Sequence, residues 1–145
     1  MFIKQLSVFV ENKSGRLAEI TSILAAAGID IRALSVADTT NFGILRIIVD
    51  KPAAAEKALK NAGLTVSLTD VIAIGIQDRP GGFAAAMKAL HAVGVSVEYM
   101  YAFISRDEGR ACVILRCSES ENNAAIKALE AAKIEILSED RIYTM

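Results

Sequence analysis

The sequence repeats itself, and this repeat constrains the fold more than any other feature. With an offset of about 66 residues, ENKSGRLAEITSILAAAGIDI aligns with QDRPGGFAAAMKALHAVGVSV, and Gly15 matches Gly81. With an offset of about 70 residues, AEKALKNAGLTV aligns with AIKALEAAKIEI. The additional residues fall in an expected turn and before a helix, where a duplicated fold tolerates them. We therefore predict two copies of one unit, over residues 1–70 and 71–145.

The hydrophobic pattern of each copy predicts strand, helix, two strands, helix and strand. In the first copy, residues 3–11 alternate apolar and polar as a half-buried strand does, and residues 15–27 have helical spacing. Residues 29–38 and 42–50 flank a short turn and predict a hairpin. Pro52 suits the first turn of a second helix, after which a last strand follows. The second copy repeats this order.

This order is the split βαβ, or ferredoxin-like, pattern. It predicts an α+β fold of two tandem ferredoxin-like βαββαβ units, with antiparallel sheets and helices packed on one face. The junction LTDVI at 68–72 has no Gly or Pro, so the last strand of one copy should run almost directly into the next. We expect the copies to pack as one body, with the edge strands near 30–39 and 96–105 at their boundary.

Composition and charge exclude several classes of protein. The net charge is −1, so no basic excess is available for a nucleic-acid partner. No apolar run reaches the ~18 residues of a membrane span. The start MFIKQLSVFV lacks the apolar stretch of a signal peptide, which favours a cytoplasmic protein.

The cysteines and the single histidine do not predict a metal or cofactor site. Cys112 and Cys117 lie an odd number of positions apart on one expected strand, so their side chains point to opposite faces. They are therefore poorly placed to bridge each other or share a metal, and we expect both to be packed apolar residues. His91 completes no ligand set, and we expect no metal and no cofactor.

The first loop of each copy is the strongest candidate for chemistry. Each loop brings a short polar side chain and a glycine to the start of a helix, where unpaired backbone N–H groups favour an anion. The alternative is that Ser14 or Asp78 only caps its helix. Recurrence of the whole loop favours a binding site in the segments Asn12-Lys13-Ser14-Gly15 and Asp78-Arg79-Pro80-Gly81.

These segments resemble the opening of ACT domains. NKSGRLAEITSILAAAGIDI and DRPGGFAAAMKALHAVGVSV share their Asn/Asp-x-Pro/Ser-Gly loop, a Leu or Phe two residues on, and a Gly-Ile/Val pair at the helix end. DTTNFGILRIIVD looks like their third strand, and the resemblance covers essentially the whole chain twice. It implies a stand-alone tandem pair of allosteric ligand-binding domains. Such domains typically bind amino acids, often where two units meet.

The resemblance also implies which residues hold the ligand. In relatives with a well-defined amino-acid site, an Asn in the first loop and a polar residue after the Gly-Ile pair do so. These roles fall on Asn12 and Asp30 in the first copy and on Asp78 and Ser96 in the second. With their neighbours, the candidate ligand-binding residues are Asn12, Lys13, Ser14, Gly15, Arg16, Leu17, Asp30, Ile31, Asp78, Arg79, Pro80, Gly81, Gly82, Phe83, Ser96 and Val97.

Two positions depart from some of these relatives. Val10 stands where certain amino-acid-binding members carry His, and Asp30 stands where they carry Asn. The carboxylate of Asp30 favours ligands with additional positive character, and it suggests histidine or a basic amino acid. Because Ser96 is neutral, we expect the two sites to be unequal.

Other functions fit the residues less well. An acyl-phosphate hydrolase would need a phosphate-cradling Arg beside a water-positioning Asn, and Asn12, Arg16 and Arg79 are not so arranged. An RNA-binding sheet needs several exposed aromatics, whereas the relevant strands of the first copy offer only Phe9 and Phe42. We therefore predict a non-catalytic, amino-acid-binding regulatory protein. The alternative is a regulatory subunit acting mainly through contacts with a metabolic enzyme, and a homodimer is compatible with either.

Overall fold

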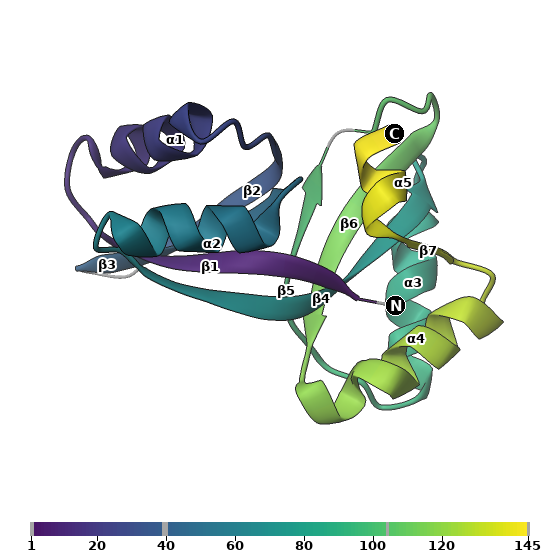
Figure 1. Ribbon diagram of the computed structural model, residues 1–145. Helices are drawn as coiled ribbons and strands as arrows, with labels where there is room; N and C mark the ends of the chain where they lie inside the picture. The colour runs from purple at the N-terminus through teal and green to yellow at the C-terminus, as the bar shows by residue number, and fades with distance from the viewer. Residues whose placement is uncertain (1, 39–40, 104, 145) are drawn as a thin grey trace. The chain divides into compact units, whose positions relative to one another are not determined.

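The computed structural model describes residues 2–38, 41–103 and 105–144. The chain forms two compact units, coloured in chain order in Figure 1. The N-terminal unit comprises Lys4–Thr69, and the C-terminal unit comprises residues 1–3 and 70–145.

In the N-terminal unit, α1 and α2 cover one face of a sheet with strand order β2-β3-β1-β4 (Figure 1). β3 pairs antiparallel with β1 and β2, with Val8 opposite Leu45. Alternate β1 residues, including Val8, enter a core with Leu24 and Leu59 from the helices. The elements are β1 (Ile3–Glu11), α1 (Arg16–Ala26), β2 (Ile31–Asp38), β3 (Phe42–Val49), α2 (Pro52–Asn61) and β4 (Thr65–Gln77), which continues into the second unit.

The C-terminal unit repeats this plan, with strand order β5-β6-β4-β7 and antiparallel pairing throughout. Ile72 and Ile74 of β4 pack with Leu90 and Leu129 of the helices. The elements are α3 (Gly82–Ala92), β5 (Val97–Phe103), β6 (Arg110–Cys117), the 3-10 turn η1 (Glu119–Glu121), α4 (Asn122–Ala131), β7 (Glu135–Leu137) and α5 (Glu139–Thr144). The predicted tandem ferredoxin-like fold is confirmed.

The connection between the repeats is also confirmed, since β4 is one strand that begins in one unit and ends in the other. The repeat boundary after Asp70 and the packing of the copies around their edge strands stay predictions. α2 begins at Pro52 as the sequence predicts, because the first helical position needs no N–H donor.

The short helix α5 is a feature that the repeat does not predict, because the first copy has no counterpart. The Ser138 hydroxyl accepts the backbone N–H of Arg141 at 3.3 Å, which satisfies one of the unpaired groups at the start of the helix. Ile142 is buried and anchors the helix. Ser138 followed by Glu139 and Asp140 was the local signal for this helix start.

Both cysteines are free and buried, as expected. Burial, followed by the nearby Glu121 carboxylate, raises the pKa of the Cys117 thiol above its ordinary value. Because the thiolate is the reacting form, we expect no rapid reaction of Cys117 with a disulfide reagent such as DTNB in the native protein. Addition of denaturant should expose both thiols, and rapid native labelling of Cys117, located by mass spectrometry, would contradict this.

Candidate functional site

The first loops of the two units share one backbone conformation. Gly15 and Gly81 occupy the N-cap positions of α1 and α3 with φ of 88° and 87°, a left-handed conformation that residues with a Cβ disfavour. Among the residues that the structure describes, neither helix has a side-chain capping hydrogen bond. The alternative role of Ser14 or Asp78 as a helix cap is therefore wrong, because the glycine itself takes the cap position.

Matching hydrogen bonds attach both loops to the neighbouring hairpin. The backbone N–H of Asn12 donates to the carbonyl of Asn41 at 3.1 Å, and that of Asp78 donates to the carbonyl of Gly109 at 2.9 Å. The next residue of each loop donates back across a tight turn, at 2.8 Å and 2.9 Å. The backbone of the two loops is therefore held in the same way, and the loops differ mainly in their side chains.

A cavity lies beside each of these loops, and we call the two the loop cavities. In the N-terminal unit it has a volume of about 250 Å³ and combines charges of both signs with apolar walls. Its lining residues are Val10, Glu11, Asn12, Lys13, Arg16, Leu17, Val36 and Gly43. The matching cavity of the C-terminal unit, of about 370 Å³, is lined by Asp78, Ala102, Phe103, Ser105, Arg110 and Ala111.

The charged groups of the N-terminal loop cavity are paired with one another. The Lys13 ammonium lies 2.9 Å from the Glu11 carboxylate, and Arg16 lies 3.7 Å from Glu11 and 2.9 Å from Glu19. Lys13, by its hydrogen bond and charge, and then Arg16 lower the pKa of Glu11. Glu19 first, and then Glu11, raise the pKa of Arg16. Glu11 and Arg16 are therefore charged at neutral pH, so the cavity places a carboxylate beside a guanidinium cation.

Asp30 and Ser96 lie at the other end of their units. Asp30 precedes β2, and its backbone N–H donates to the Asp50 carboxylate at 2.9 Å, just as Ser96 donates to Glu121 at 3.3 Å. The 11 residues of α1 separate Asp30 from Asn12 by roughly 16 Å. A single unit does not bring these two residues together. The contribution of Asp30 to the ligand stays a prediction.

The other candidate residues fall into different surroundings. Leu17 is 45% exposed at the N-terminal loop cavity, whereas its counterpart Phe83 packs against the core of the C-terminal unit. Arg79, Gly81 and Gly82 line a different cavity from Asp78. The exposed Ser14 and Pro80 complete the loops, and Ile31 and Val97 begin β2 and β5.

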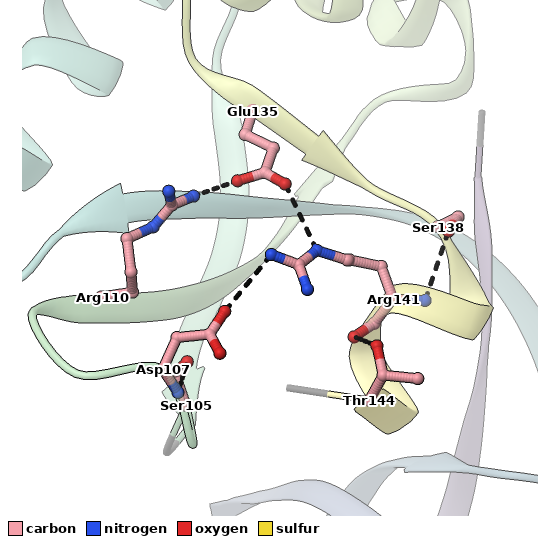
Figure 2. A network of polar contacts seen from close by, with 7 residues as sticks. All are labelled: Ser105, Asp107, Arg110, Glu135, Ser138, Arg141 and Thr144. Carbon is pink, nitrogen blue, oxygen red and sulfur yellow. Dashed lines mark hydrogen bonds and ion pairs between the residues drawn. The ribbon is translucent and has the colours of Figure 1, made fainter.

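Sequence reasoning missed a charged network in the C-terminal unit (Figure 2). Arg110 of β6 donates to the Glu135 carboxylate of β7, and Arg141 Nε of α5 lies 3.5 Å from the same carboxylate. Arg141 also donates to Asp107 at 3.2 Å, which attaches α5 to the β5–β6 hairpin. Phe42 stands at the position of Arg110 in the first copy, so the repeat gave no sign of this network.

Other kinds of site find little support in residues 2–38, 41–103 and 105–144. There, no three His, Cys, Asp or Glu side chains gather as metal ligands. No helix in these segments has the length and apolar character needed to cross a membrane. His91 lies in the last turn of α3.

Two ferredoxin-like units with matching glycine-containing first loops place the chain among proteins built from a tandem pair of such domains. A family model for the ACT domain pair matches residues 1–145, and the chain belongs to this family. A crystal structure of protein BT0572 from Bacteroides thetaiotaomicron is 41% identical, with a TM-score of 0.91 over 100% of this chain and 98% of that one. A search of curated proteins finds no match.

More distant solved structures share the fold. The regulatory subunit of aspartate kinase from Thermus thermophilus is 20% identical, with a TM-score of 0.66 over 89% of this chain and 91% of that one. The same subunit from Thermus flavus is 19% identical, with a TM-score of 0.61 over the same shares. These structures agree in fold with the family match, which makes the chain an ACT domain pair.

Proposed function

We propose that this protein is a non-catalytic regulator that binds an amino acid at the first loops. The observation that carries this proposal is the composition of the N-terminal loop cavity. An α-amino acid needs a donor or cation for its carboxylate, an acceptor for its ammonium, and space for its side chain. Arg16, Glu11 and the apolar Val36 line one cavity and meet these three needs.

The two loops should not bind equally. The N-terminal loop cavity contains the neutral amide of Asn12 with Lys13, Arg16 and Glu11, whereas its C-terminal counterpart has the carboxylate of Asp78 at the Asn12 position, with Arg110. We propose that the N-terminal loop binds more tightly. The expected contribution of Asp30 favours histidine or a basic amino acid as the ligand.

The second part of the proposal concerns the partner that this protein regulates. The solved structure from Thermus thermophilus is described as the regulatory subunit of aspartate kinase, and this chain shares its fold. We propose a metabolic enzyme as the class of partner. Under this proposal, ligand binding changes the contact with that enzyme, and this chain itself catalyses no reaction.

Calorimetric titration of the full chain with the twenty amino acids tests the binding proposal. At least one amino acid should bind, and Asp30→Ala should weaken binding by roughly ten- to a hundredfold, because charge-assisted hydrogen bonds contribute about 1.5–3 kcal/mol. Asn12→Ala should weaken binding by a smaller factor, since it removes a neutral amide. Glu130→Ala, which removes a carboxylate from the exposed surface of α4, should leave the affinity unchanged.

The outcomes separate the parts of the proposal. Because Asp30 and Asn12 lie at opposite ends of one unit, loss in both variants means that the ligand needs groups from two copies of the unit. Loss in Asn12→Ala alone restricts the site to the loop cavity and removes Asp30 from it. Unchanged affinity in both variants, or no binding of any amino acid, refutes the proposed site.

A further inference from the structure

Each unit has a second cavity, between the start of its first helix and the turn after its second helix. We call these the turn cavities. That of the N-terminal unit, about 390 Å³, is lined by Phe9, Val10, Glu11, Arg16, Glu19, Phe42, Ala62, Gly63, Leu64 and Thr65. That of the C-terminal unit, about 250 Å³, lies at the matching positions of the repeat. The repeat therefore provides an internal comparison of charge.

The two turn cavities differ in charge. In the N-terminal unit the single cation, Arg16, forms ion pairs with the two lining carboxylates, Glu11 and Glu19. The C-terminal turn cavity is lined instead by three cations, Arg79, Arg110 and Lys133, and one carboxylate, Glu135. Within the described residues, neither Arg79 nor Lys133 has a side-chain hydrogen bond or ion pair. The C-terminal cavity therefore has an excess of positive charge.

Arg110 is fixed in place without using all its donors. Figure 2 shows its guanidinium directed at Glu135, which also contacts Arg141 on the other side. The Nε of Arg110 is buried and has no hydrogen-bond partner among the described residues. Because Arg141 shares the Glu135 carboxylate, this carboxylate neutralises Arg110 only in part. A buried N–H donor without an acceptor is costly unless a ligand or water supplies one.

Gly75 provides the space that the Arg110 guanidinium occupies. A Cβ at this position would lie 2.6 Å from Arg110 Nη2 and 3.2 Å from Glu135 Oε2. In the first copy the matching residue is Phe9, and the uncharged Phe42 stands at the Arg110 position; both line the N-terminal turn cavity. Relative to the first copy, glycine replaces Phe9 and arginine replaces Phe42. The aromatic lining of the turn cavity is thereby exchanged for a cationic one.

Lys133 stands at a position where the first copy has glycine. Its φ is 60°, and it is the only residue other than glycine with positive φ in the described part of the chain. The matching Gly63 has φ of 86°. Helices commonly end with a glycine in this conformation because a Cβ disfavours it. The lysine thus brings a cation to the cavity at a conformational cost.

We propose that the C-terminal turn cavity binds a phosphoryl group, as free phosphate or on a small phosphorylated molecule. Its three cations come from separate elements: the loop before α3, strand β6 and the turn after α4. A tetrahedral group accepts hydrogen bonds from several directions, whereas a planar carboxylate favours two coplanar donors. Three cations beside one shared carboxylate also suit a dianion. Arg110 also lines the C-terminal loop cavity, but this site shares no lining residue with the N-terminal loop cavity and does not depend on amino-acid binding there.

Titration of the full chain with inorganic phosphate and with glycerol 3-phosphate at low ionic strength tests the site. We expect saturable binding of at least one probe, and the tighter probe identifies the source of the phosphoryl group. Arg110→Gln should weaken binding of the tighter probe at least about tenfold, because a charge-assisted donor is lost. Gly75→Ala should act similarly by displacing the guanidinium. Lys127→Gln removes one positive charge from the exposed surface of α4 and should leave affinity unchanged.

Lys133→Gly distinguishes a binding role from a structural one. It introduces the residue that the first copy carries, so the melting temperature should stay the same or rise while phosphate affinity falls several-fold. Equal affinity in the wild type, Arg110→Gln and Lys133→Gly would overturn the proposal, as would the absence of saturable binding. Succinate binding at least tenfold tighter than both phosphate probes would overturn the choice of a phosphoryl group.

Discussion

Replacing Leu90 with Ala is expected to lower the free energy of unfolding by about 3–5 kcal/mol, through lost apolar burial and the cavity left behind. Leu90 is 1% exposed and lies in the core of the C-terminal unit. Leu24→Ala removes the matching side chain from the core of the N-terminal unit and should cost a similar amount. Denaturant unfolding followed by circular dichroism measures both.

Leu17→Ala provides a control on the same helix as Leu24. Because Leu17 is 45% exposed, its truncation should cost less than about 1 kcal/mol. If the units unfold in one transition, Leu24→Ala and Leu90→Ala both shift that transition; if they unfold separately, each variant shifts one. A cost below about 1 kcal/mol for Leu90→Ala would show that the core relaxes around the missing side chain.

The sequence was sufficient to predict the regular elements because local patterns determine most of them. Alternation along β1 places Val8 in the core, and helical spacing does the same for Leu24. Pro52 marks the start of α2 without any tertiary information. α5 was not predicted, because Ser138 and the residues after it have no counterpart in the first copy.

The candidate site was predicted in part. The first loops were found because their glycines recur, and the structure places Asn12 and Arg16 on one cavity. The cap role of Ser14 failed because a positive φ makes Gly15 the cap, and side-chain propensity does not report φ. The separation of Asp30 from Asn12 follows from the direction of α1, which motif matching ignores.

The charged network was beyond sequence reasoning for a different reason. Arg110 and Glu135 lie on different strands, and their contact depends on both strands flanking β4. Sequence spacing gives no measure of that distance. Comparison of the copies does carry a signal, because Gly75 replaces Phe9 and Lys133 replaces Gly63. Positions at which the two copies carry different types of residue indicate where one copy has acquired its own chemistry.

Gly82→Ala is expected to destabilise the protein by about 1–3 kcal/mol, the usual cost of inserting a methyl group where there is no space. A Cβ at Gly82 would lie 2.1 Å from the backbone oxygen of Gln77, which is not the end of a flexible side chain. The matching residue of the first copy is Arg16, so the position itself does not demand glycine. The turn is tighter in the second copy, with Gly82 N–H to Arg79 carbonyl at 3.0 Å, against 3.4 Å at Arg16.

Gly81→Ala separates this steric effect from backbone strain. Gly81 has φ of 87°, but a Cβ there would meet nothing within 4 Å, so the cost should be the ~1 kcal/mol of a left-handed alanine. Denaturant unfolding of both variants should therefore rank Gly82→Ala as the more damaging. The reverse order would mean that the loop relaxes to the looser turn of the first copy.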